Sequence, residues 1–210
     1  MFDVLAAQQL IDLKSVFSSA PVIYVLLALM SIASMGIWIY SLLTFRTKDI
    51  MPENFRSELR DLLQQEQYEK AHLLCATKEN LLSTLVKMGL TTRAFGPQIM
   101  IDSMKSEGKR ASTSFWQRLS LLNDIVIIAP MLGLLGTVIG MFYAFYDVNR
   151  SIESINSLFD GLGIAVGTTV MGLIVAILAM IFHATLKYRV VRTLSLVENE
   201  ALNLSALIRK

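Results

Sequence analysis

Three long apolar stretches, separated by polar segments, dominate the pattern of the chain. They cover residues 21–45, 121–146 and 161–186, and each is long enough to cross the roughly 30 Å hydrocarbon core of a bilayer as a helix. Between the first two, residues 46–120 place apolar side chains at three- and four-residue steps, the period of a helix with one buried face. The pattern predicts an all-α integral membrane protein with three transmembrane helices and a helical region outside the membrane.

The polar segments each have a predicted form. Residues 1–20 lack the cleavage site of a signal peptide, and they space their apolar residues like an amphipathic helix on the membrane surface. A long helix is expected to begin near Gly96-Pro97 and to continue from the polar region into the second span, because no turn signal separates the two. Residues 147–160 are predicted to form a short polar link, and residues 187–210 a C-terminal helix.

Lysine and arginine are distributed unevenly between the two sides of the membrane that three spans would create. Residues 46–120 contain 12 of the 19, and the segment after the third span contains five. The N-terminal segment and the link contain one each. Because short cytoplasmic loops are enriched in these residues, the N-terminus is predicted outside, and the helical region and the C-terminus in the cytoplasm.

Two of the spans carry small residues along one helical face. In the second span this face contains Gly133, Gly136, Thr137, Gly140 and Ala144. In the third span, small or polar residues follow one another at steps of four, three, four, three and four: Ala165, Thr169, Gly172, Ala176, Ala179 and His183. Small faces let helices approach closely where burial from water no longer drives association. The residues predicted to make these helix contacts are Gly133, Gly136, Gly140, Ala165, Gly172 and Ala176.

The threonines on or beside these faces, Thr137, Thr168 and Thr169, allow two interpretations. Each hydroxyl can donate to a carbonyl of its own helix, which is the usual arrangement for a single helix rich in small residues. Two consecutive spans with matched faces favour the other interpretation, in which the hydroxyls line a hydrated path or solvate a polar group of a partner. If the two spans pack side by side, Thr137 and Thr169 are expected to face one space at mid-membrane depth.

Acidic and basic side chains are absent from the middle of all three apolar stretches. A protein that moved protons alone would carry an acid at depth, so this chain would have to borrow one from a partner. His183 lies about one turn before Lys187, where a structural role is favoured over a proton relay.

Other kinds of site are not predicted. The single cysteine, Cys75, excludes an internal disulfide and a cysteine-based zinc site, and its helical setting favours a half-buried packing role. The sequence has no paired acids, histidine–cysteine set or phosphate-binding loop, so neither an enzyme nor a cofactor or metal site is expected. The net charge of +2, without a basic patch, argues against nucleic acid as a partner.

The string APMLGLLGTVIGM at residues 129–141 closely resembles the signature of the ExbB/TolQ/MotA proton-channel family. Residues 161–177, GLGIAVGTTVMGLIVAI, resemble the family's second signature around a threonine pair. The similarity extends to residues 68–71 and to the lead-in at residues 110–122, and it covers most of residues 20–190. Three spans with one large region between the first two fit the ExbB/TolQ branch better than the four-span flagellar stators.

The resemblance implies a proton-conducting subunit of an ExbB–ExbD- or TolQ–TolR-like motor in the bacterial inner membrane. Five such subunits would form a ring whose second and third spans surround the single transmembrane helices of a dimeric ExbD- or TolR-like partner. That partner would supply the missing aspartate. Thr137 and Thr169, which match the family's pore threonines, would orient water beside it. Proton entry would drive motion that the partner passes to the periplasm, for energised import or envelope maintenance.

Two positions depart from the family's pattern. Many ExbB and TolQ members have a glutamate early in the third span where this chain has Ile164, and many have a proline where it has Leu178. The missing glutamate argues against a proton relay on this subunit alone. A second hypothesis, from a different class, is a non-conducting scaffold whose small faces only assemble a complex.

Overall fold

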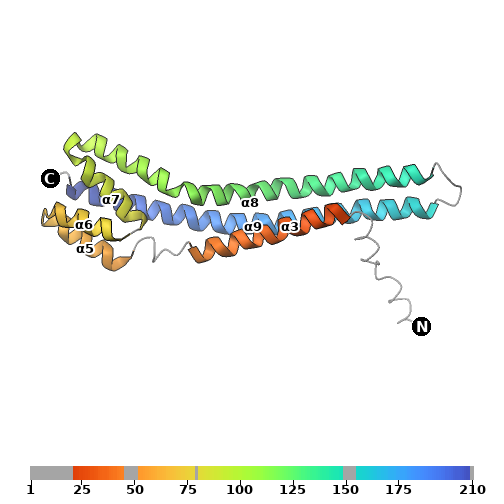
Figure 1. The fold of residues 1–210 in the computed structure, drawn as a ribbon, viewed down its shortest axis with the longest axis horizontal. Coiled ribbons are helices and arrows are strands. Elements are labelled where there is room, and N and C mark those ends of the chain that lie inside the picture. Colours follow the sequence, from red (N-terminus) through yellow and green to blue (C-terminus); the bar gives the residue numbers. More distant parts are fainter. Residues whose placement is uncertain (1–20, 45–51, 79, 149–154, 209–210) are drawn as a thin grey trace, which may run out of the picture. The chain divides into compact units, whose positions relative to one another are not determined.

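The structure, a computed structural model, describes residues 21–44, 52–78, 80–148 and 155–208. Every regular element in these ranges is helical and none is a strand (Figure 1). In chain order the elements are α3 (Pro21–Thr44), α5 (Glu53–Gln64), α6 (Tyr68–Thr77), α7 (Leu81–Thr92), the 3-10 helix η1 (Arg93–Phe95), α8 (Pro97–Val148) and α9 (Ile155–Ile208). The helices α3, α8 and α9 are long and apolar enough to cross a membrane. The predicted fold class is confirmed.

Helix α8 joins polar and apolar sequence without a break. It begins at Pro97, whose missing N–H is not needed in the first turn, directly after Gly96 with a φ of +101° that favours glycine. It then continues through Pro130 to Val148. The expected long helix that starts near Gly96 and enters the second apolar stretch is therefore present.

Helix α9 is longer than the third apolar stretch at both ends. It begins at Ile155 and ends at Ile208, so residues 187–208 continue the same helix. The segment expected as a polar link, 147–160, is helical at both of its ends. Polar side chains at a helix end remain hydrated, and composition alone therefore does not separate such an end from a loop. The predicted amphipathic segment, 1–20, lies outside the described residues.

The chain divides into two compact units. The apolar unit comprises the described residues of 1–37 and 121–183, and the polar unit comprises those of 38–120 and 184–210. The three long helices each contribute residues to both units.

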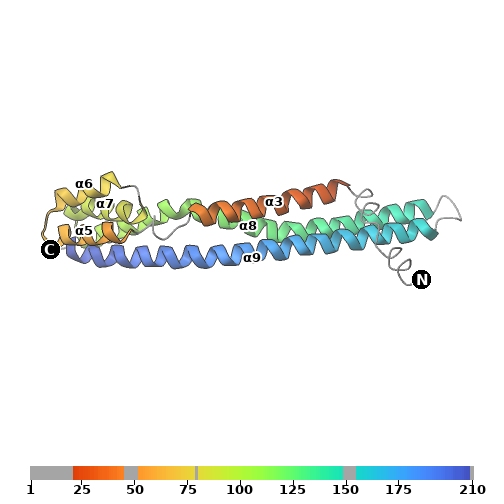
Figure 2. The same ribbon diagram turned by 90° about the horizontal axis from the view of Figure 1, so that it is seen from below.

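In the apolar unit, α3 packs against both α8 and α9, which lie side by side in both views (Figures 1 and 2). Side chains from all three helices form one buried cluster: Ile23, Leu27, Ala129, Val175 and Ala176. Partly buried apolar side chains pack around it: Met30, Ile125, Leu132, Ile139 and Met171. Helix α3 therefore covers one side of the α8–α9 pair.

The polar unit contains the three short helices and the polar ends of the long ones. Its most buried side chains come from α5 to α9 and include Phe55, Leu59, Ala71, Leu82, Val86, Met100, Met104 and Leu204. A capping box between Asn80 and Ser83 begins α7. Arg60 Nη2 lies 2.8 Å from Glu200 Oε1, an ion pair that joins α5 to the C-terminal part of α9.

Cys75 lies in the core of this unit. It is 4% exposed, so it is more deeply buried than the half-buried position predicted from the sequence. Burial raises the pKa of its thiol to about 12, and the nearby Lys87 ammonium opposes this rise to a smaller extent. The thiol is therefore protonated at neutral pH and is a weak nucleophile.

We expect Cys75 of the native chain to react slowly with iodoacetamide. A thiol pKa raised from 9.0 to about 12 lowers the thiolate fraction near neutral pH by about 1000-fold, and burial restricts access further. Mass spectrometry of the intact chain measures the modified fraction over time. The same chain unfolded in SDS is the control and should be modified rapidly. Equal rates for the native and unfolded chains would contradict the buried thiol.

Candidate functional site

The glycines of α8 bring its backbone into direct contact with α9. A Cβ added to Gly133 would lie 3.0 Å from the carbonyl oxygen of Thr168 and 3.1 Å from the Cα of Thr169. A Cβ added to Gly140 would lie 2.9 Å from the carbonyl oxygen of Gly161. Contacts this short to backbone atoms leave no room for a side chain, so the small face of α8 meets the backbone of α9.

The face of α9 is equally small where it meets α8. A Cβ on Gly172 would lie 2.7 Å from the carbonyl oxygen of Ala129 and 3.0 Å from the Cα of Gly133. At the other end of the contact, a Cβ on Gly161 would lie 2.5 Å from the Cβ of Ala144. Residue numbers rise along α8 while they fall along α9, so the two helices pack antiparallel over about three to four turns.

The predicted contact residues fall on this interface, and other residues belong to it as well. Ala165 is buried beside Gly140, and Ala176 joins the cluster formed with α3. Ala129 and Gly161, which the predicted set did not include, stand four residues before Gly133 and Ala165, respectively. Extending the four-residue step by one turn in each span would have found them.

Thr168 is enclosed within this interface. Its side chain is fully buried, and a Cβ added to Gly136 would collide with its Cβ and Oγ1. The hydroxyl donates within α9, at 3.1 Å to the carbonyl oxygen of Ile164 and 2.9 Å to that of Ala165. Thr168 thus fills the space that Gly136 leaves, in the way the packing interpretation describes.

Thr137 and Thr169 are only partly buried, and their hydroxyls differ in what they bind. Thr137 Oγ1 donates to the carbonyl oxygen of Leu134 in its own helix, at 2.6 Å. Thr169 Oγ1 donates across the interface to the carbonyl oxygen of Gly133 on α8, at 3.2 Å. The cross-helix bond is possible because Gly133 lets the two backbones approach.

The positions of these two threonines follow from their neighbours. Two residues that come one position before a glycine of the small face, Leu132 on α8 and Met171 on α9, pack against the buried cluster to which α3 contributes Ile23 and Leu27. Thr137 comes one position after Gly136, and Thr169 one position after Thr168. One residue is about 100° of helix rotation, so both threonines stand at the edge of the α8–α9 contact that faces away from α3.

Acidic and basic side chains do not contribute to this edge. Residues 125–146 of α8 contain no acidic or basic side chain, and residues 161–182 of α9 contain none either. His183, near the end of the apolar stretch, is partly buried. Among the described residues, no group of three or more His, Cys, Asp or Glu side chains could hold a metal ion.

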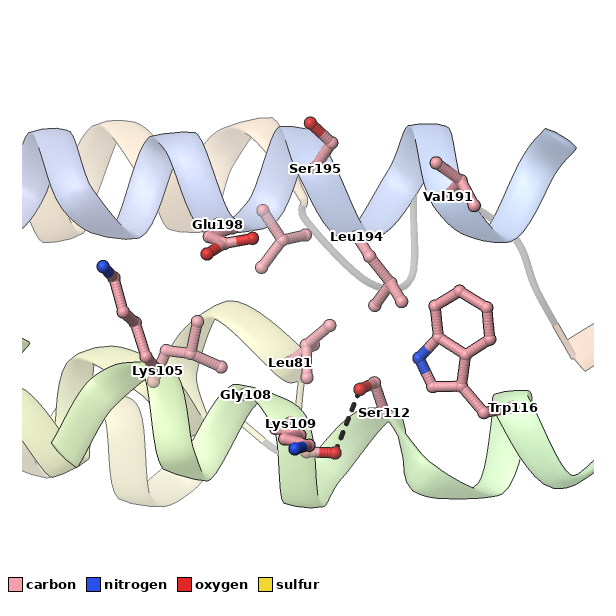
Figure 3. Close-up of a pocket in the computed structure, with 12 residues that line it drawn as sticks. Leu81, Lys105, Gly108, Lys109, Ser112, Trp116, Val191, Leu194, Ser195 and Glu198 are labelled. Atoms are coloured by element: carbon pink, nitrogen blue, oxygen red, sulfur yellow. Dashed lines mark hydrogen bonds between the residues drawn. The ribbon is translucent and has the colours of Figure 1, made fainter. Parts of the chain in front are cut away.

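A cavity of about 340 Å³ lies elsewhere, in the polar unit, and contains none of the predicted site residues. Figure 3 shows Trp116 and Lys105 of α8 facing Leu194 and Glu198 of α9 across it. Ser112 on its wall donates to the carbonyl oxygen of Lys109, at 3.0 Å. This cavity has charges of both signs, which distinguishes it from the uncharged edge of the apolar unit.

Comparison with known proteins agrees with the signatures in the sequence. Residues 76–199 match the sequence profile of the MotA/TolQ/ExbB proton channel family. The biopolymer transport protein exbB1 of Vibrio cholerae is 35% identical over 126 residues, which are 59% of this chain and 55% of that protein. The biopolymer transport protein ExbB of Aquifex aeolicus is 31% identical over 110 residues, 49% of this chain and 74% of that protein. The chain thus spans about half the length of the first relative.

The α8–α9 contact predicts that Gly172→Ala destabilises the fold. The new methyl group would lie 2.7 Å from the Ala129 carbonyl oxygen, and a backbone atom can move away only if the helices separate. We expect a loss of about 1–3 kcal/mol, the usual cost of overpacking, measured by thermal unfolding in one detergent with circular dichroism.

Gly163→Ala is the matched control for this variant. It lies on the same helix, but a Cβ there has no atom within 4 Å. It should be neutral or slightly stabilising, since alanine forms helix better than glycine by about 1 kcal/mol. Equal effects of the two substitutions would show that the close helix contact is absent.

Proposed function

The chain belongs to the MotA/TolQ/ExbB proton channel family, and we propose that it is the channel subunit of an ExbB–ExbD- or TolQ–TolR-like motor. In this proposal the motor lies in the bacterial inner membrane and converts proton motive force into work on the outer membrane or envelope. The observation that carries the proposal is the edge of the α8–α9 contact, where two hydroxyls, those of Thr137 and Thr169, stand in apolar sequence that has no acid of its own.

The lack of an acid defines the partner. Protons cross a hydrocarbon layer readily only where polar groups and water replace the lost hydration, and a carboxylate is the usual proton-carrying group. We therefore assign the aspartate to a single-span ExbD- or TolR-like partner, present as a dimer. The small face of α8 is already in contact with α9. The partner helix is therefore proposed to pack on the edge of the α8–α9 contact that carries Thr137 and Thr169.

A ring of five copies around that dimer is the assembly that we propose, with the number taken from the family resemblance. The N-terminus would be periplasmic, and the polar unit and C-terminus cytoplasmic, which follows the distribution of lysine and arginine. In such a ring the large apolar side chains exposed on the apolar unit, including Leu135, Val138, Phe142, Val166 and Val170, would contact lipid or neighbouring copies.

The threonines suit a carboxylic acid in a particular way. A hydroxyl has one donor and two acceptor lone pairs, and in this structure both donors are already used, by the carbonyls of Leu134 and Gly133. An approaching acid would therefore meet acceptors. Acceptors favour the protonated acid, which can donate, over the carboxylate, which cannot.

One observation favours the second hypothesis, a scaffold without ion flux. Thr137 and Thr168 donate to carbonyls of their own helices, which is what threonines with a packing role alone would do. The Thr169 hydroxyl does not follow that pattern, because it donates to the carbonyl oxygen of Gly133 on the other helix. The two hypotheses differ in what they require of the hydroxyls.

Replacing the hydroxyls separates the two hypotheses. We expect Thr137→Val and Thr169→Val to lower proton flux through the assembled complex by about tenfold or more, because about 1.4 kcal/mol of lost polar stabilisation corresponds to a tenfold slower step. Flux is measured with a pH-sensitive dye in vesicles that contain the complex. Thr169→Ser keeps a hydroxyl and should retain most of the flux.

Two further measurements make this test specific. Thr113→Val, in the polar unit, also removes a hydroxyl that donates to its own helix, at 3.1 Å, and should leave flux unchanged. Size-exclusion chromatography checks that every variant still assembles. Normal flux in both valine variants, with assembly intact, would favour the scaffold.

Purification of the tagged chain from its own membranes in mild detergent tests the partner directly. We expect a small protein with one membrane span that contains an aspartate and is followed by a periplasmic domain. It should be recovered in a fixed ratio to this chain. A homo-oligomer that is reproducibly free of such a protein would leave the channel without its acid and would refute the motor.

A further inference from the structure

A second cavity in the polar unit has a charge composition unlike that in Figure 3. It lies between the end of α3 and the middle of α9 and has a volume of about 650 Å³. Arg189 and Arg192 of α9 line it, and no acidic residue does. Each of the other cavities described in this unit has at least one carboxylate on its wall. The cavity is therefore positively charged.

The two arginines have no acidic partner among the described residues. The ion pairs found there join Arg60 to Glu200 and Arg110 to Glu107. The nearest acid further along α9, Glu198, lines the cavity of Figure 3 instead. Both arginine side chains are exposed, so their charge is available to an anion from outside the chain.

The remaining walls are aromatic and aliphatic. Trp38 and Leu42 come from α3, and Tyr188 and Leu196 from α9. The Trp38 indole N–H donates to Thr185 Oγ1, at 3.1 Å. This bond holds the indole ring of α3 against α9 at the wall of the cavity. A small hydrated anion would interact with the arginines but would gain nothing from the aromatic and aliphatic side chains. A molecule with an anionic headgroup and an apolar body can contact both the arginines and the apolar walls.

The position of the cavity along the chain points to the membrane surface. The apolar stretch of α9 ends at Leu186, and the cations Lys187, Arg189 and Arg192 follow within two turns. Trp38 stands in the last two turns of the apolar helix α3, where interfacial aromatics are expected. Basic pockets between transmembrane helices at this level suit the headgroups of anionic lipids.

We propose that this cavity binds an anionic phospholipid. The phosphodiester lies between Arg189 and Arg192, and the glycerol and the start of the acyl chains lie against Trp38, Tyr188 and Leu42. This site is separate from the edge that contains Thr137 and Thr169, and the proposal does not depend on proton conduction.

Trp38 can report on its own lipid environment. The chain has two tryptophans, and Trp116→Phe leaves Trp38 as the only one. This single-tryptophan chain is placed in phosphatidylcholine vesicles that contain a small fraction of phosphatidylglycerol, with bromine on the acyl chains of one lipid or the other. We expect brominated phosphatidylglycerol to quench Trp38 about 25-fold more effectively per molecule, since each of the two arginines attracts anionic lipid by about fivefold.

Two double variants with equal charge change locate the effect. Arg189→Gln with Arg192→Gln should abolish the preference for phosphatidylglycerol. Lys105→Gln with Lys109→Gln removes two exposed charges from the cavity of Figure 3 and should leave the preference intact. Circular dichroism checks the helix content of both.

Three results would overturn the proposal. The first is equal quenching by the two brominated lipids in the single-tryptophan chain with both arginines, which needs no arginine variant to interpret. The second is a preference that survives the loss of both arginines. The third is a preference lost equally in the lysine variant, which would reflect general surface charge rather than this cavity.

Discussion

The contact between the backbones of α8 and α9 determines most of the apolar unit. At Gly133 and Gly172 the helices approach so closely that a Cβ on either would meet backbone atoms of the other. Such a contact fixes the relative depth of the two helices and the rotation of each about its axis. Once the rotation is fixed, Leu132 and Met171, which each come one position before a glycine of the contact, pack against the cluster that includes α3 side chains. Thr137 and Thr169 lie on the opposite side of the small faces. The location of the threonines is thus a consequence of the glycines.

The sequence pattern predicts these features to different degrees. The three spans and the small faces follow from composition and from steps of three and four residues, both of which are local properties. The helical ends of the segment 147–160 could not be predicted, because a hydrated helix end and a loop share the same composition. The burial of Cys75 also depends on the packing of α6 against the helices before and after it, α5 and α7, which no periodicity within α6 reveals.

The predicted site also has features that follow from local periodicity and features that depend on tertiary contacts. The periodicity places Thr137 and Thr169 at equivalent positions on two helices, and this equivalence needs only the helical repeat. The acceptor that each hydroxyl uses is set by tertiary contact. Thr169 reaches Gly133 on the other helix because that position has no side chain, whereas Thr137 bonds to Leu134 within its own helix. A sequence alone could not distinguish the two.

Under the proposed function, the bond from Thr169 to Gly133 makes helix packing and proton conduction depend on the same hydroxyl. A hydroxyl within the membrane must have an acceptor, since an unsatisfied polar group there costs several kcal/mol. The glycine carbonyl accepts the hydroxyl proton in the chain by itself, and the lone pairs of the hydroxyl remain as acceptors. The hydroxyl oxygen of Thr169 therefore holds α8 against α9 and, in the proposed motor, would also accept a hydrogen bond from the partner. A threonine hydroxyl is therefore compatible with this apolar helix pair, because its bond to Gly133 stabilises the pair of α8 and α9 even when no partner is bound.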